Sequence, residues 1–126
     1  MRGFTNRIIT YLAQRRKLKK SGDIFRATIT SSELLTISRM IPEDNFHDRQ
    51  NNAPSFNDFL QSATLCGKCL YDIYIVPSSR IDERVTIDGA WIPANRGDVL
   101  AFLINKALEK PEEMYHTRGY IRVWWD

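Results

Sequence analysis

This chain of 126 residues has few cysteines and no long apolar run, and these two shortages exclude disulfide-held scaffolds and membrane-spanning helices. It has only two cysteines, too few for a scaffold held by disulfides, which favours a reducing, cytoplasmic location. It has no apolar run close to the ~20 residues that cross a bilayer, so no transmembrane segment is predicted. No short apolar segment follows the first basic residues, so a secretory signal is not expected. Length and composition are those of one soluble globular domain over residues 1–126.

Acidic residues are absent from the first twenty positions, where seven basic residues lie. The remaining residues hold 11 basic and 15 acidic side chains, so positive charge is concentrated at one end. This asymmetry indicates an anionic partner, with nucleic acid first among the candidates, because lysine and arginine neutralise phosphates and release counterions. The predicted contacts are Arg7, Arg15, Arg16, Lys17, Lys19 and Lys20. A solvated helix end, or a basic segment on an anionic membrane, are the alternatives.

Catalytic motifs are also scarce. The chain has no glycine-rich phosphate loop, no nucleophile elbow and no paired metal-ligand motif, which argues against most enzyme classes. His116 stands beside Thr117 and Arg118, a combination that could bind or activate an anionic substrate, and His47 beside Asp48 offers a second base. A small enzyme centred on His116 and Arg118 is therefore kept as an alternative hypothesis.

Cys66 and Cys69 form the one motif with metal or redox chemistry. Two thiolates at this spacing can share a zinc ion or form a redox pair. A tetrahedral zinc site needs two more ligands, so it would have to recruit His47 and His116. The alternative is a pair of half-buried thiols beside a glycine turn, and no cofactor is part of the main prediction.

The most regular pattern lies around Asp88-Gly89. Two β-branched or aromatic runs, 84–87 and 90–92, flank this dipeptide, which favours a type I′ turn. The pattern predicts a β-hairpin, and Pro93 ends its second strand because proline has no N–H for the ladder.

The remaining periodicity predicts an α+β fold with an antiparallel or mixed sheet of about four to five strands. Expected strands cover residues 24–30, 69–76, 84–87, 90–92 and 119–125. Expected helices cover residues 4–20, 33–40, 55–65 and 98–108.

Two further stretches bear on partners. Residues 43–53 are polar and predict an exposed, mobile loop. Trp124 and Trp125 alternate on the last strand, so one of them should point away from the core. Trp125 is predicted to be the exposed one and to contact a protein partner or a second copy.

The main hypothesis is a small non-catalytic accessory or regulatory protein that binds a polyanion through a basic N-terminal helix. The alternatives are a protein-interaction module or homodimer that uses the strand of Trp125 or the 43–53 loop, and the small enzyme.

Overall fold

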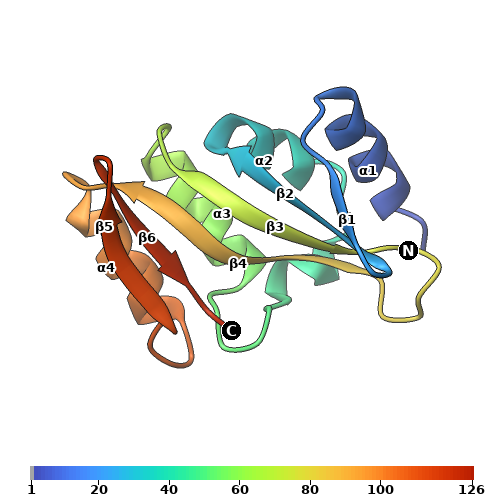
Figure 1. The fold of residues 1–126 in the computed structure, drawn as a ribbon. Helices are drawn as coiled ribbons and strands as arrows, with labels where there is room; N and C mark the ends of the chain where they lie inside the picture. Colours follow the sequence, from blue (N-terminus) through green and yellow to red (C-terminus); the bar gives the residue numbers. More distant parts are fainter. Residues whose placement is uncertain (1) are drawn as a thin grey trace.

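The computed structural model describes residues 2–126 and shows an α+β fold (Figure 1). A six-stranded sheet is antiparallel at every pairing, with strand order β1-β2-β3-β4-β6-β5. The strands are β1 (Lys19–Ser21), β2 (Ile24–Thr30), β3 (Leu70–Val76), β4 (Arg84–Pro93), β5 (Glu113–Thr117) and β6 (Tyr120–Trp124). The helices of this part of the chain are α1 (Thr5–Gln14), α2 (Ser31–Ser38), α3 (Phe56–Leu65), α4 (Gly97–Lys106) and the 3₁₀ helix η1 (Glu43–His47).

Most of the expected elements are present close to their expected bounds, because their local signals agree with the fold. Strand β2 has the predicted bounds, and β3 and β6 differ from theirs by a residue at one or both ends. Helices α2 and α3 begin with a capping box, formed by Thr30 with Glu33 and by Ser55 with Asp58. The sheet was expected to be antiparallel or mixed, and it is antiparallel throughout.

The Asp88-Gly89 hairpin predicted from the sequence is wrong. Residues 84–93 form one continuous strand whose two halves pair with the same neighbour, β3. Asp72 pairs with Gly89 and Ile73 with Ile87, so Asp88 is an extra residue, a β-bulge, within a strand that does not reverse. The Asp88 carbonyl then accepts a hydrogen bond from the Trp125 amide at 2.8 Å.

Gly89 is needed because neighbouring side chains lie close to its backbone, and not because the chain turns there. Its φ is not positive, so any residue could adopt the backbone conformation. A Cβ there would collide with the Arg122 guanidinium and would lie 2.9 Å from Asp72 Oδ2 and 3.0 Å from the Val123 carbonyl. The glycine therefore lets an arginine lie flat across the sheet.

Helix α1 is shorter than the predicted helix 4–20. It ends at Gln14, and Arg16 takes a positive φ of 58°, which turns the chain out of the helix. Lys19 and Lys20 belong to the edge strand β1, where Lys19 pairs with Arg26. The periodicity of Phe4, Ile8 and Leu12 was correctly assigned to a helix, but the basic residues after Gln14 continue no apolar stripe.

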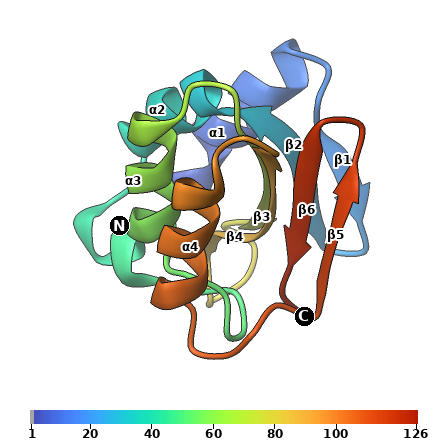
Figure 2. The ribbon, with the colours of Figure 1, turned by 90° about the vertical axis from the view of Figure 1, so that its left-hand side faces the viewer.

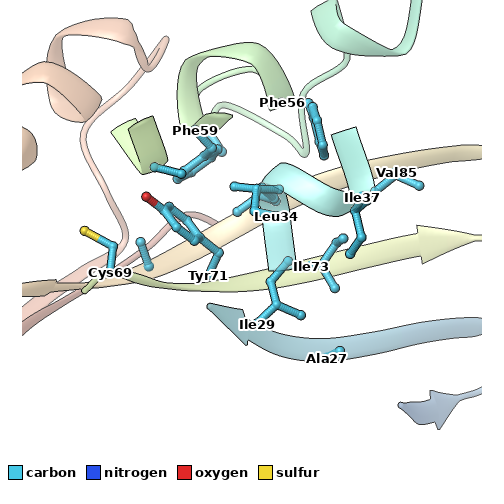
Figure 3. Packing of buried hydrophobic residues seen from close by; sticks show 14 of the residues in the cluster. Ala27, Ile29, Leu34, Ile37, Phe56, Phe59, Cys69, Tyr71, Ile73 and Val85 are labelled. Carbon is cyan, nitrogen blue, oxygen red and sulfur yellow. The ribbon is translucent and has the colours of Figure 1, made fainter. Parts of the chain in front are cut away.

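The four α-helices cover one face of the sheet, and no described element covers the other (Figure 2). The core lies between the helices and the sheet. Figure 3 shows Ile29, Tyr71 and Ile73 of the strands facing Leu34 and Phe59 of the helices. The arrangement divides the sheet into an apolar, packed face and a face open to solvent.

The segment 43–53 is not the exposed loop that its composition predicted. Asn45 is 2% exposed, and its side-chain amide both donates to and accepts from the Val85 backbone at 2.9 Å. It thereby takes the place of a neighbouring strand at the part of β4 that β6 does not reach. Phe46 packs edge-to-face on Phe56, and Ala53 is buried.

The N-terminus of α1 is capped from a distant part of the chain. Its preceding residue offers no side-chain cap. Instead, the Glu83 carboxylate accepts hydrogen bonds from the amides of Gly3 and Thr5, at 2.7 and 3.1 Å, and from the Thr5 hydroxyl at 2.6 Å. Burial opposes its ionisation, but these hydrogen bonds outweigh that effect and lower the pKa of Glu83.

None of the helices in residues 2–126 has the length and apolar character that a membrane span requires.

Replacing Gly89 by alanine tests the close packing against Arg122. We expect Gly89→Ala to lower the free energy of unfolding by about 2 kcal/mol, because the added Cβ must displace the guanidinium or the Asp72 carboxylate. Gly67→Ala is the matched control, since Gly67 has an ordinary φ and nothing within 4 Å of a new Cβ. Urea unfolding of both variants makes the measurement, and equal stabilities would contradict the packing argument.

Candidate functional site

The open face of the sheet, opposite the helices, combines charged and aromatic side chains. Strand alternation and the observed register place these residues there. They are Arg26 and Thr28 from β2, Asp72 and Tyr74 from β3, Trp91 from β4, Arg122 and Trp124 from β6, and Tyr115 from β5. Soluble antiparallel sheets commonly leave one face in water, but such faces are usually polar and not rich in aromatic rings.

Asp88 at the bulge forms the first of two arginine–aspartate pairs. Arg26 Nη2 lies 3.0 Å from Asp88 Oδ1 and 2.8 Å from Oδ2. The Asp88 side chain is 6% exposed and that of Arg26 is 34% exposed, so the guanidinium shields the carboxylate from water. The bulge thus orients a carboxylate toward β2, two strands away.

Asp72 forms the second pair, with Arg122. Arg122 Nη2 lies 2.6 Å from Asp72 Oδ2, and the Thr28 hydroxyl donates to Oδ1 at 3.1 Å. Burial raises the pKa of Asp72, although Arg122 and Thr28 both favour its charged form. The guanidinium also donates to the Val123 carbonyl at 2.7 Å, so this pair is fixed to the backbone.

Each arginine also lies over an aromatic ring. The Arg122 Cζ is 4.0 Å from the centre of the Trp91 ring, and the Arg26 Cζ is 5.3 Å from that of Tyr74. Cation–π contact and the aspartates together hold both guanidinium planes along the sheet. The result is a rigid surface of flat, delocalised groups.

A groove of about 330 Å³ runs from this surface to the basic edge strand. Its lining includes Lys19 and Lys20 of β1, Arg26 and Thr28 of β2, and Asp72 of β3. Lys19 lies opposite Arg26 in the register, which places two cations on neighbouring strands. Lys19 and Lys20 have no ion-pair partner among residues 2–126.

The structure separates the six cations that the sequence grouped as one site. Arg15 and Lys17 both bond to the carboxylate of Glu33, so one of their two positive charges is balanced within the protein. Arg7 lies on α1 and lines a different hollow, together with Tyr11 and Met40. The remaining three, Arg16, Lys19 and Lys20, are exposed and unpaired among the described residues.

Glu33 is the centre of a small polar network. It is buried, it completes the capping box of α2 through the Thr30 amide, and it accepts from Lys17 and Arg15. Burial would raise the pKa of Glu33, but the hydrogen bonds from Lys17, the Thr30 amide and Arg15 together lower it to about 2. The basic segment after α1 is therefore anchored to α2 through Arg15 and Lys17.

Trp125 is the buried member of the tryptophan pair, so its expected role as an exposed contact is wrong. It is 1% exposed, its ring packs edge-to-face on Phe59, and its indole N–H donates to the Glu109 carbonyl at 2.9 Å. Trp124 is the half-exposed one. Strand β6, which ends at Trp124, lies inside the sheet between β4 and β5, so it offers no free edge.

Cys66 and Cys69 are both buried thiols in the connection between α3 and β3 (Figure 3 shows Cys69 beside Tyr71). Within residues 2–126, no third histidine, cysteine, aspartate or glutamate joins them to form a metal site. Burial and the neighbouring Cys66 raise the pKa of Cys69 to about 12, which makes it a poor nucleophile at neutral pH. The pair fits core packing better than zinc or redox chemistry.

The two histidines lie far apart in the fold. His47 ends η1 and His116 lies on the edge strand β5. Arg118 follows in the β5–β6 turn with a φ of 44°, and both His116 and Arg118 are exposed. The two side chains project from an exposed hairpin, which offers little shelter for a reacting group.

The sequence analysis missed Arg26, Arg122 and Asp72 as site residues. One signal was available: Asp72 interrupts the otherwise apolar strand Leu70–Val76, and a carboxylate in such a position needs a partner. Its partner Arg122 is 50 positions away, so the pairing could not be read from spacing.

Comparisons of the chain with protein-family models, with curated proteins and with solved structures find no significant match.

Acid titration tests the Glu33 network. The pKa of Glu33 is lower in the folded state than its ordinary 4.5, so its contribution to stability is complete above about pH 4.5 and is lost as the pH falls toward 2. We expect Glu33→Gln to cost about 2 kcal/mol at pH 7, and the difference from the native protein to close as the pH approaches 2. Glu43→Gln is the control, because the Glu43 side chain has no hydrogen bond or ion pair to another residue of the range 2–126. Parallel curves for the native protein and Glu33→Gln would refute the argument.

Thiol labelling tests the burial of the cysteines. We expect an aromatic disulfide reagent at pH 7 to react slowly with the native protein and rapidly in concentrated urea, because the raised pKa of Cys69 leaves almost no thiolate. Leu65→Cys supplies the positive control, since Leu65 is 56% exposed. Native cysteines that label as fast as this control would contradict the assignment.

Proposed function

We propose that this protein is a small non-catalytic binding protein that holds single-stranded nucleic acid across the open face of its sheet. The observation that carries the proposal is the groove that joins the unpaired lysines of β1 to Arg26, whose guanidinium lies over the Tyr74 ring on the open face. Phosphates would contact Lys19, Lys20 and the nearby Arg16, and bases would lie against the flat groups beyond them.

Two features favour a single strand over a duplex. Bases stack on aromatic or guanidinium planes only when they are unpaired and turned outward. On the open face, Trp124 offers such a plane, and Tyr74 and Trp91 each carry a guanidinium over the ring; all three side chains are partly buried. A duplex would present mainly its phosphates, and the unpaired cations at this edge are too few to hold it strongly.

Arg26 and Arg122 have a different role from the lysines. Their charge is balanced by Asp88 and Asp72, so they add little to long-range attraction. Their planes remain fixed by those carboxylates, and a fixed plane loses less entropy when a base stacks on it. Sequence preference is not expected, because stacking tolerates every base.

The proposal includes a cytoplasmic location. The low cysteine content favours this location, because proteins of reducing compartments are rarely stabilised by disulfides.

Salt titration of oligonucleotide binding tests the proposal. We expect a labelled oligothymidylate of about 20 nucleotides to bind with an affinity that falls as salt rises, with a logarithmic slope of about −2 for three phosphate contacts. The Lys19→Glu/Lys20→Glu variant should lose at least about tenfold in affinity and show a shallower slope. Fluorescence anisotropy over a salt series measures both.

Charge-matched and aromatic variants complete the design. Lys106→Glu/Lys110→Glu changes the net charge equally near the end of α4, away from the groove, and should bind almost as the native protein does. Trp124→Ala should weaken binding about tenfold with little change in the salt slope, because it removes stacking and no charge. An affinity that does not change with salt concentration would refute the proposal. An equal loss of affinity in the two lysine double variants would refute it as well.

A further inference from the structure

The two edges of the sheet differ in how well they are protected from other strands. Edge strand β1 is three residues long and carries Lys19 and Lys20, both of which discourage pairing with another strand. Edge strand β5 is five residues long, contains no proline and is paired with β6 without a bulge. Figure 1 shows β5 at the edge of the sheet opposite β1.

Strand β5 is exposed on both of its faces. Met114 is 54% exposed and Tyr115 is 52% exposed, although they point to opposite sides. An edge strand that belonged only to this sheet would be expected to bury at least one face. These apolar side chains at a regular edge mark β5 as an interaction surface.

The turn before β6 determines which backbone groups of β5 are free. Arg118 and Gly119 have φ angles of 44° and 85°, the pattern of a type I′ two-residue turn. Such a turn makes Thr117 and Tyr120 a hydrogen-bonded pair, so Glu113, Tyr115 and Thr117 direct their N–H and C=O groups toward β6. Met114 and His116 then direct theirs outward.

The two ends of β5 carry opposite charges, so two copies of the strand can pair with their charges matched. Glu112 and Glu113 lie at its start and Arg118 follows its end, and neither Glu112 nor Arg118 has an ion-pair partner among residues 2–126. Antiparallel pairing of two identical strands places the start of one beside the end of the other. An acidic start and a basic end therefore attract in a pair of β5 strands.

We propose that a second copy of this chain pairs with β5 about a two-fold axis at Tyr115, which joins the two sheets into one. Met114 of each copy lies opposite His116 of the other. The outward N–H and C=O groups of these two residues, four in each strand, can therefore form hydrogen bonds with those of the second copy. Glu112 of each copy lies opposite Arg118 of the other.

Neighbouring registers fit less well. An axis at Met114 would set Lys110 opposite Arg118, two positive charges, and an axis at His116 would leave Glu112 opposite Tyr120 of the hairpin's other strand. The axis at Tyr115 alone combines matched hydrogen-bonding groups with opposite charges at both ends.

A five-residue edge is a small contact, below the ~1,200 Å² of a stable interface, so we expect a weak dimer that exchanges with the monomer. Analytical ultracentrifugation of the full chain from about 1 µM to about 1 mM should show a reversible rise in mass toward the dimer. A single monomeric species throughout this range would overturn the proposal.

Disulfide capture tests the register. The two Tyr115 side chains form a non-hydrogen-bonded pair at the axis, where Cβ atoms lie about 5 Å apart. Tyr115→Cys should therefore cross-link into a dimer under mild oxidation. Thr117→Cys is on the same face but about 13 Å from its copy, so it should cross-link far more slowly. Equal rates for the two variants would overturn the proposed pairing.

Charge exchange tests the complementarity. Glu112→Lys and Arg118→Asp should each weaken the dimer about fivefold or more, and the double variant should restore it. Arg118→Asp creates an Asp-Gly turn, which suits a type I′ hairpin, so the fold is retained. Lys68→Asp, the same charge change at an exposed loop away from β5, should leave the dimer constant unchanged. Failure of the double variant to recover would overturn the ion pair and with it the axis at Tyr115.

Discussion

A sheet covered on one face only must stabilise its other face with its own side chains, and this constraint shapes the molecule. Two arginine–aspartate pairs meet it here, each reaching across the strands and each with its guanidinium over an aromatic ring. The pairs account for Gly89, which makes room for Arg122, and for the bulge at Asp88, which orients a carboxylate toward Arg26. The same pairs hold both guanidinium groups against aromatic rings on the open face, and the proposed nucleic-acid interface rests on them.

Local patterns predicted those elements whose own residues decide their structure. The strand Ile24–Thr30 and the helix Phe56–Leu65 carry their alternation, periodicity and caps within themselves. The Asp88-Gly89 dipeptide had the composition of a turn, but Ile87 and Ala90 both gain more from pairing with β3 along one continuous, bulged strand. Tertiary context overruled the short-range signal, and the reason for the glycine lies 33 positions away in Arg122.

The basic N-terminal segment shows a similar division between composition and placement. Its charge excess could be read directly, but the separation of its members could not. Arg15 and Lys17 turn inward to a single carboxylate on α2, while Lys19 and Lys20 form an edge strand. The buried position of Trp125 followed the same logic: alternation showed that one tryptophan must be buried, and only the fold determined which.

The long-range cap of α1 has a consequence for the order in which the chain acquires structure. Helix α1 lacks a side-chain cap of its own, and the carboxylate that satisfies its first amides is Glu83, 78 positions after Thr5. Short helices are marginal in water without tertiary support. Helix α1 therefore reaches its native stability only after β1, β2, β3 and Glu83 have been synthesised, although its own residues are made before all of them.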